Sequence, residues 1–69
     1  MSYFRFKSTA KTIYAEGTGT QACEYLEWLN YAMPPKHWTV IQIDESSATN
    51  RYVLDLTEAL LDINGSEEE

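Results

Sequence analysis

Cys23 is the only cysteine in this chain of 69 residues, so the chain lacks the cross-links on which domains of this size often depend. One cysteine can form neither an intramolecular disulfide nor a cysteine-based metal cluster. A domain of about 60 residues buries only about 60% of the surface that its unfolded chain exposes. Burial against a second copy or a foreign protein is the remaining source of stability, so we expect an interface, and a homodimer is one form of it.

The charged residues are distributed unevenly. Five Lys and Arg stand against eleven Asp and Glu, for a formal net charge of −6. Residues 1–15 contain Arg5, Lys7 and Lys11 and no acid, whereas residues 16–69 contain every acid. A negative chain repels phosphate backbones, so we expect no direct binding to nucleic acid and instead a protein partner with a basic surface. An acidic surface that only keeps the protein in solution is the alternative.

The sequence predicts a single domain over residues 1–66 and a disordered acidic tail over residues 67–69, where three glutamates are adjacent. No internal repeat or linker divides the domain. No apolar run approaches the roughly 18 residues of a membrane span. The first residues lack the apolar core of a signal peptide, so we expect a cytoplasmic protein that does not contact a membrane.

Alternating residues predict a hairpin at the N-terminus. Phe4 and Phe6 alternate with polar residues over 3–7, and Ile13 and Ala15 do so over 12–16. A period of two is typical of a half-buried strand, with these four residues on the inner face. The polar residues between the two runs have the length of a hairpin loop, so we expect an antiparallel pair.

A helix is predicted from Thr18 to about residue 33. Thr18 and Gln21 have the spacing of a capping box, and Thr20 is a competing N-cap. Two prolines at 34 and 35 end the helix, because a residue before proline avoids the α region. The apolar residues that share one helical face are Ala22, Tyr25, Leu26, Leu29 and Met33.

Residues 37–44 are the most strand-like run in the chain. Ile41 and Ile43 share one face with Thr39, and Trp38 lies on the other, less obviously buried face. A polar loop is expected over residues 45–50.

Residues 51–63 are ambiguous. Alternation of Tyr52, Leu54 and Leu56 favours a strand over 51–56, followed by a helix from Thr57 to residues 64–65. A single helix over 49–63 is the alternative, because four apolar residues also share one helical face: Val53, Leu56, Leu60 and Ile63. The favoured interpretation is an α+β fold in the order ββαββα, a small antiparallel sheet with helices on one face.

The sequence contains no pattern typical of an active site. Cys23 and His37 can be paired as a nucleophile and a base, but Cys23 adjoins the apolar face of the helix, where a small buried cysteine is ordinary. His37 is expected in an exposed turn, and two ligands are too few for a metal centre. The acid pairs look solvated, and the glycines complete no phosphate-binding motif. We therefore expect a non-enzymatic protein without cofactor or metal.

The aromatic residues indicate an interface instead. Two Trp, five Tyr and two Phe exceed what so small a core can hide. Exposed Tyr and Trp are typical anchors of protein interfaces. Trp28 and Tyr31 fall on the side of the helix opposite its apolar face, next to Glu24 and Glu27. The residues that we expect to bind a partner are Tyr14, Glu24, Glu27, Trp28, Tyr31, Asp44 and Glu45.

One stretch of the chain resembles a known family. Residues 13–16 (Ile-Tyr-Ala-Glu), a helix carrying Glu27 and Trp28, and the strand over 38–43 follow the element order of small phage-encoded ββαβ inhibitor proteins, such as inhibitors of RNA polymerase. The resemblance covers roughly residues 3–44. The arginines that the family uses to contact polymerase fall at Gln42 and Asp44 here, so that contact is not carried over.

The resemblance implies a small phage or mobile-element protein that acts by binding, as anti-restriction and anti-CRISPR proteins do. Together with the charge and the aromatic residues, it predicts an inhibitor that occupies a basic surface of a host nucleic-acid-handling complex. The alternative is a structural homo-oligomer or assembly subunit without a foreign target.

Overall fold

The computed structural model describes residues 1–32 and 37–67. The elements in chain order are β1 (Ser2–Lys7), β2 (Thr12–Gly17), α1 (Gly19–Ala32), β3 (Thr39–Ile43), α2 (Glu45–Ala48), β4 (Val53–Asp55) and α3 (Leu56–Glu67). The α+β class is confirmed, and the predicted order is found with one added helix, α2. The expected helix end at residues 33–35 and the last two glutamates lie outside the described residues.

The N-terminal hairpin is confirmed. β1 and β2 pair antiparallel, with Phe4 opposite Ala15 and Phe6 opposite Ile13, so these residues share the inner face. Buried Ser8 closes the turn, because its N–H donates to the Lys11 carbonyl at 2.9 Å and its Oγ accepts the Lys11 N–H at 3.1 Å. The turn therefore satisfies the polar groups of a buried serine.

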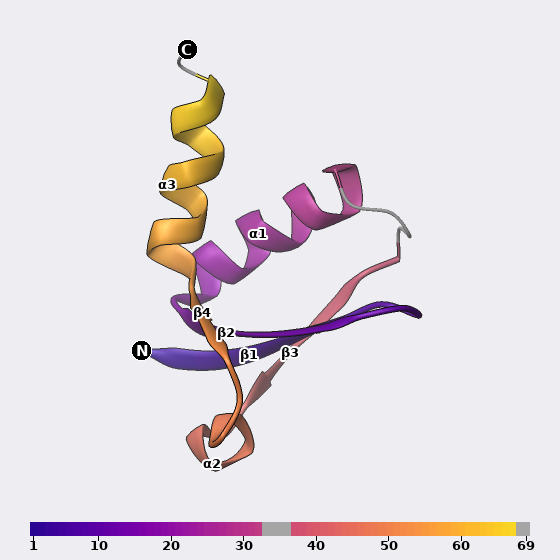
Figure 1. Ribbon diagram of the computed structural model, residues 1–69, viewed down its shortest axis with the longest axis vertical. Coiled ribbons are helices and arrows are strands. Elements are labelled where there is room, and N and C mark those ends of the chain that lie inside the picture. The colour runs from indigo at the N-terminus through magenta and orange to yellow at the C-terminus, as the bar shows by residue number, and fades with distance from the viewer. Residues whose placement is uncertain (33–36, 68–69) are drawn as a thin grey trace.

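The sheet is mixed and not antiparallel throughout, in the order β3-β1-β2-β4 (Figure 1). β1 is antiparallel to β2 and β3, whereas β4 runs parallel to β2 at the opposite edge from β3. The expected antiparallel sheet is therefore wrong at its last strand, because β4 pairs parallel with β2 and not with β3. Pairing with β2 places Leu54 beside buried Ala15 and delivers Leu56, which is fully buried, to the core.

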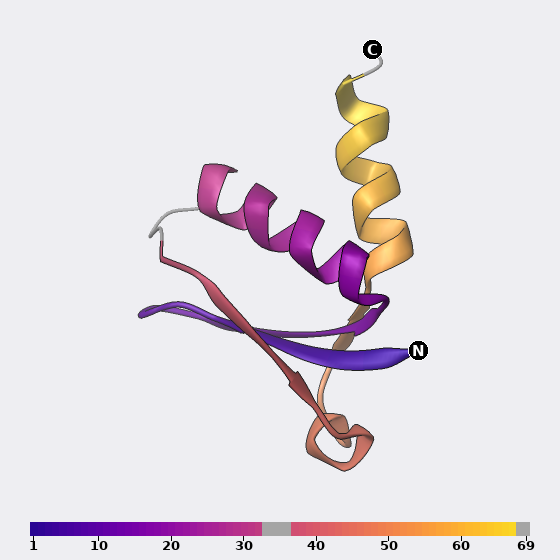
Figure 2. The ribbon, with the colours of Figure 1, turned by 180° about the vertical axis from the view of Figure 1, so that it is seen from behind.

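The helices lie on both faces of the sheet. α1 covers one face, α3 starts on the same side and rises away from the sheet, and α2 lies on the other side (Figures 1 and 2). Two predictions are wrong here: the polar loop over 45–50 contains a helix, and the helices do not all lie on one face. The reason is that this segment connects the edge strand β3 with the opposite edge strand β4 and therefore crosses the sheet. Ala48 of α2 is buried and lies near Tyr3 and Val53.

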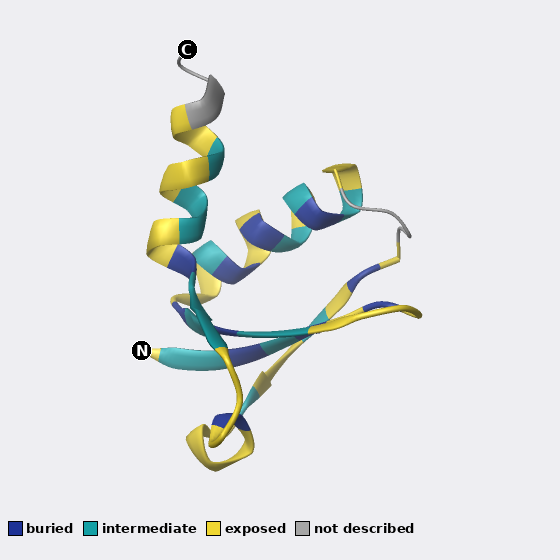
Figure 3. Ribbon diagram, in the orientation of Figure 1, coloured by how far each residue is buried: buried dark blue, intermediate teal, exposed yellow. Residues whose placement is uncertain are grey.

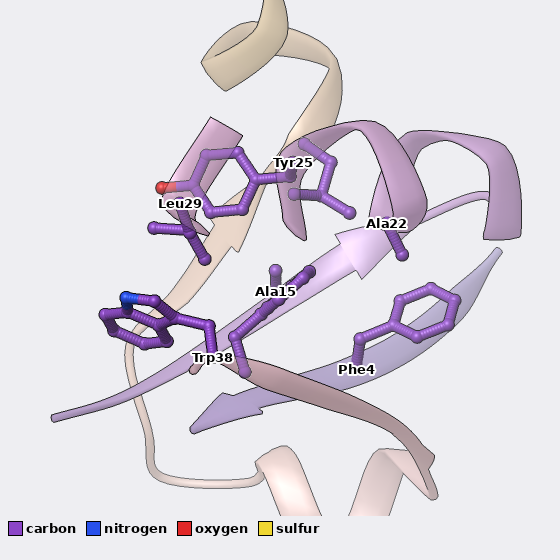
Figure 4. Packing of buried hydrophobic residues seen from close by; sticks show 8 residues of the cluster. Phe4, Ala15, Ala22, Tyr25, Leu29 and Trp38 are labelled. Atoms are coloured by element: carbon purple, nitrogen blue, oxygen red, sulfur yellow. The ribbon is translucent and has the colours of Figure 1, made fainter. Parts of the chain in front are cut away.

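Side chains from the sheet and α1 form the core (Figure 4). Phe4 and Phe6 of β1 pack with Tyr25 and Leu29 of α1. Trp38 is only 4% exposed and belongs to this cluster, so its placement on the less buried side of β3 is wrong.

The pairing register explains the burial of Trp38. Phe6 lies opposite Val40, so the even-numbered residues of β3 face the helices and Ile41 is left 48% exposed on the other face. The backbone N–H of Trp38 donates to Asn30 Oδ1 at 2.8 Å, which ties the residue before β3 to α1.

The predicted capping box begins α1. The Gln21 N–H donates to Thr18 Oγ1 at 3.2 Å, and the Thr18 N–H donates to Gln21 Oε1 at 3.0 Å. Thr20 is therefore not the cap. Gln21 Nε2 also donates to Thr57 Oγ1 at 3.0 Å and so joins α1 to α3.

The strand-plus-helix interpretation of residues 51–63 is confirmed, and the single helix is wrong. α3 begins at Leu56, where the Asp55 carboxylate accepts the Thr57 N–H at 2.9 Å. Thr57 is therefore not its N-cap. The helix also continues past the expected end at residues 64–65 to Glu67, since Gly65 adopts helical geometry inside it.

α3 rises away from the sheet beyond its first turn (Figure 3). Its exposed residues include Leu61, which is 65% exposed. A helix of 12 residues is marginal by itself, so α3 depends on the packing of Ala59, Leu60 and Ile63 against the core. None of the helices over the described residues is long and apolar enough to cross a bilayer.

Candidate functional site

A groove of about 280 Å³ lies between α1 and α3 and is called the helix groove below. Residues from α1 and α3 line it: Glu24, Glu27, Trp28 and Tyr31 from α1, and Leu60, Ile63 and Asn64 from α3. The structure therefore brings together four of the seven residues expected to bind a partner. The two helices diverge around this groove (Figure 2).

The apolar floor of the helix groove is fixed by the core. The Trp28 ring stacks on Tyr25 with centroids 5.7 Å apart, and Tyr25 meets Phe6 edge to face at 5.3 Å. Trp28 is half-buried and packs against the core, so the expectation that it points away from the apolar face is only partly met. A Trp28 ring that stacks on a buried Tyr25 offers apolar area at little cost in side-chain entropy.

The rim of the helix groove is acidic. Glu24 and Glu27, both exposed on α1, are the charged residues that line the groove. Over 19–32 and 56–65 these two helices contain no lysine or arginine. Tyr31, which is 85% exposed, stands at the far end of the groove. Carboxylates around an apolar floor fit a ligand that is both cationic and apolar.

The other three predicted residues lie elsewhere. Tyr14 is on the opposite face of the sheet, where the Arg51 guanidinium sits 4.8 Å from the centre of its ring. Asp44 and Glu45 are exposed at the start of α2. The Glu45 carboxylate raises the pKa of the Tyr3 phenol, with smaller contributions from desolvation and Glu16. The structure therefore does not join these residues to the helix groove.

Cys23 and His37, the two residues considered as a nucleophile and a base, do not line the helix groove. Cys23 is exposed, so its expected burial beside the apolar face of α1 is wrong. Cys23 follows buried Ala22 by one position on the helix, and this turns its side chain toward solvent. His37 is exposed in a turn, as expected, with φ of 77°. No group of three or more His, Cys, Asp or Glu within 1–32 and 37–65 could hold a metal ion.

Sequence reasoning missed the α3 wall of the helix groove. Leu60 and Ile63 had been recognised only as members of an apolar helical face. That apolar face is the sequence signal from which they could have been predicted. The sheet does not cover it, so it must contact α1 or a partner. No family model, curated protein or solved structure matches this chain.

Proposed function

We propose that this chain is a non-enzymatic binding protein whose helix groove holds a basic amphipathic helix of another protein. The observation that carries the proposal is an apolar floor between α1 and α3 with two glutamates, Glu24 and Glu27, beside it and no basic residue among the described residues that line it. An amphipathic helix lays its apolar face into such a groove, and its cationic residues then meet the rim.

In this proposal the apolar floor and the acidic rim of the helix groove contribute differently to binding. Trp28, Leu60 and Ile63 supply the apolar area whose burial stabilises the complex. Glu24 and Glu27 steer the encounter and select a basic partner, because complementary charge raises the association rate and excludes acidic competitors. Leu60 and Ile63 of α3, which are only half-buried, are then covered by the bound helix.

The finer proposal concerns the partner. Basic surfaces that hold nucleic acid contain lysine and arginine beside apolar residues. A small acidic protein seated on such a surface competes with the nucleic acid for the same cations. We therefore propose that the protein inhibits a host nucleic-acid-handling complex, with a phage or mobile element as its source.

Reversal of two charges on the rim tests the groove. The double variant Glu24→Lys/Glu27→Lys is expected to bind a synthetic leucine–lysine amphipathic helix about tenfold more weakly than wild type, because two favourable charge contacts become repulsive. Titration followed by backbone amide NMR reports both the affinity and the site. In wild type the largest shifts are expected along α1 and α3.

The matched control is Asp44→Lys/Glu45→Lys, which makes the same charge change at α2, away from the groove. It is expected to weaken binding less than twofold. Equal losses of affinity in the two double variants would show that net charge alone attracts the peptide. That result would overturn the proposal that the helix groove is the binding site. Competition between this protein and nucleic acid for captured host proteins then tests the finer proposal.

A second candidate function is self-assembly, and the free edge of β3 favours it. Within residues 1–32 and 37–67, β3 pairs only with β1, and its residues Thr39–Ile43 include neither a charge nor a proline. Charges and prolines are the usual protection of an edge strand against pairing with another chain. Two copies paired antiparallel about Ile41 would form one continuous sheet.

Ile41→Lys tests self-assembly. If β3 joins two copies, sedimentation at micromolar concentration is expected to show a wild-type dimer and a monomeric variant, because facing lysines repel across the pair. Leu61→Lys, which places the same charge on exposed α3, is expected to remain dimeric. A monomeric wild type would remove this candidate.

A further inference from the structure

A second hollow, of about 530 Å³, lies at the edge of the sheet where β2 extends beyond β4. We call it the edge groove. Ile13, Leu54 and the Tyr25 ring form its apolar floor, and the segment that leads into β4 forms one wall. Its volume falls in the range of small-molecule sites. It is separate from the helix groove, with which it shares no lining residue.

The charge of the edge groove is opposite to that of the protein as a whole. Lys11 and Arg51 line it, and none of the lining residues is acidic. These are two of the five basic residues in a chain with eleven acids. Because like-signed cations repel each other, two of them beside an apolar floor favour an anionic ligand.

Both cations stand on backbone that is held in place. Lys11 belongs to the turn closed by Ser8, which accepts the Lys11 N–H at 3.1 Å. Arg51 follows Asn50, whose φ of 66° suits asparagine, and the Arg51 N–H donates to the Ala48 carbonyl at 3.2 Å. The guanidinium lies 4.8 Å from the centre of the Tyr14 ring. A site ordered before binding loses less entropy when the ligand arrives.

Two tyrosines add aromatic and polar groups. Tyr52 lines the edge groove and is 83% exposed, so its ring is open to stacking by a planar ligand. Burial raises the pKa of Tyr25, so its phenol keeps its proton well above neutral pH and can donate a hydrogen bond.

We propose that the edge groove binds a mononucleotide, with the phosphate between Lys11 and Arg51 and the base against Tyr52. A phosphate on a planar ring matches cations beside an exposed aromatic ring. A long single strand fits less well, because the net charge of −6 repels each further phosphate. This site is independent of the helix groove, so the tests of partner binding at the helix groove do not decide it.

Titration with adenosine monophosphate, followed by amide NMR, tests the proposal. Saturable shifts are expected at residues 11–14 and 50–54, and adenosine without phosphate is expected to bind about tenfold more weakly. Inorganic phosphate is expected to shift the amides next to Lys11 and Arg51 only. Absence of saturable shifts up to about 10 mM nucleotide, or equal affinity for adenosine, would overturn the proposal. Tight binding of an oligonucleotide with a steep salt dependence would overturn it in favour of a strand-binding surface.

Arg51→Gln and Lys11→Gln are each expected to weaken nucleotide binding about tenfold. Lys7→Gln is the matched control, because Lys7 is an exposed cation on neighbouring β1 that does not line the edge groove. It is expected to weaken binding less than twofold. The spectrum of each variant without ligand shows whether the fold is retained. A loss as large in Lys7→Gln as in Arg51→Gln would show that the groove is not the site.

Discussion

Leu29→Ala is expected to lower the free energy of unfolding by about 3 kcal/mol. Leu29 is fully buried where α1 packs on the sheet, so truncation removes apolar contact and leaves a cavity (Figure 4). A domain of this length has roughly 3 to 10 kcal/mol of stability, so the loss is a large part of the total. Urea unfolding followed by circular dichroism is the measurement, and the midpoint is expected to fall by about 3 M or the variant to be unfolded without urea.

Leu61→Ala is the matched control for this prediction. It makes the same chemical change on α3, where the side chain is 65% exposed. Its effect is expected to stay within about 0.5 kcal/mol. A loss under about 1 kcal/mol in Leu29→Ala would contradict the packing of α1 on the sheet described here, because a well-packed site cannot lose a leucine at that cost.

Gly17→Ala is expected to destabilise the protein by about 2 kcal/mol or more. A Cβ at this position would lie 2.5 Å from Gln21 Oε1 and 3.0 Å from Leu56 Cβ. Gln21 cannot swing away freely, because its oxygen caps Thr18 and its nitrogen bonds Thr57. The φ of Gly17 is 159°, which adds backbone strain for alanine. Thermal unfolding is expected to show a lower Tm.

Gly19→Ala provides the comparison, since a Cβ at Gly19 would meet no atom within 4 Å. This substitution lies at the start of α1 and is expected to be neutral or to stabilise by up to about 1 kcal/mol. Equal destabilisation by the two substitutions would mean that residues 17–19 respond to the loss of glycine in general. The close approach of α1 and α3 at Gly17 would then not be responsible.

The groups that sequence analysis placed correctly depend on near neighbours. The first strands alternate with a period of two, and the turn between them is short, so Phe4 and Ala15 could be assigned to one face. Thr18 and Gln21 sit three residues apart and could be assigned to a capping box. The exposure of Tyr31 also followed from its position on the side of the helix away from the apolar face, whereas the exposure of Tyr52 was not predicted.

The helix groove could be predicted in part. The α1 residues Glu24, Glu27 and Trp28 were found because they lie on one side of a helix, and helical spacing is a local property. Leu60 and Ile63 could not be matched to them, because the crossing of two helices depends on where α3 starts in space. The edge groove was missed entirely, since Lys11 and Arg51 are 40 positions apart in the chain.

The sequence by itself therefore determined the secondary-structure elements other than α2, the N-terminal hairpin, the capping of α1 and the acidic character of its outer face. Only the tertiary structure decided that β4 pairs parallel with β2, that α2 crosses the far face of the sheet and that Trp38 is buried. The physical reason is the range of the interactions. Periodicity and capping act within a few residues, whereas strand pairing depends on which distant edge buries the most apolar surface, and residues 51–56 bury theirs against β2 and α1.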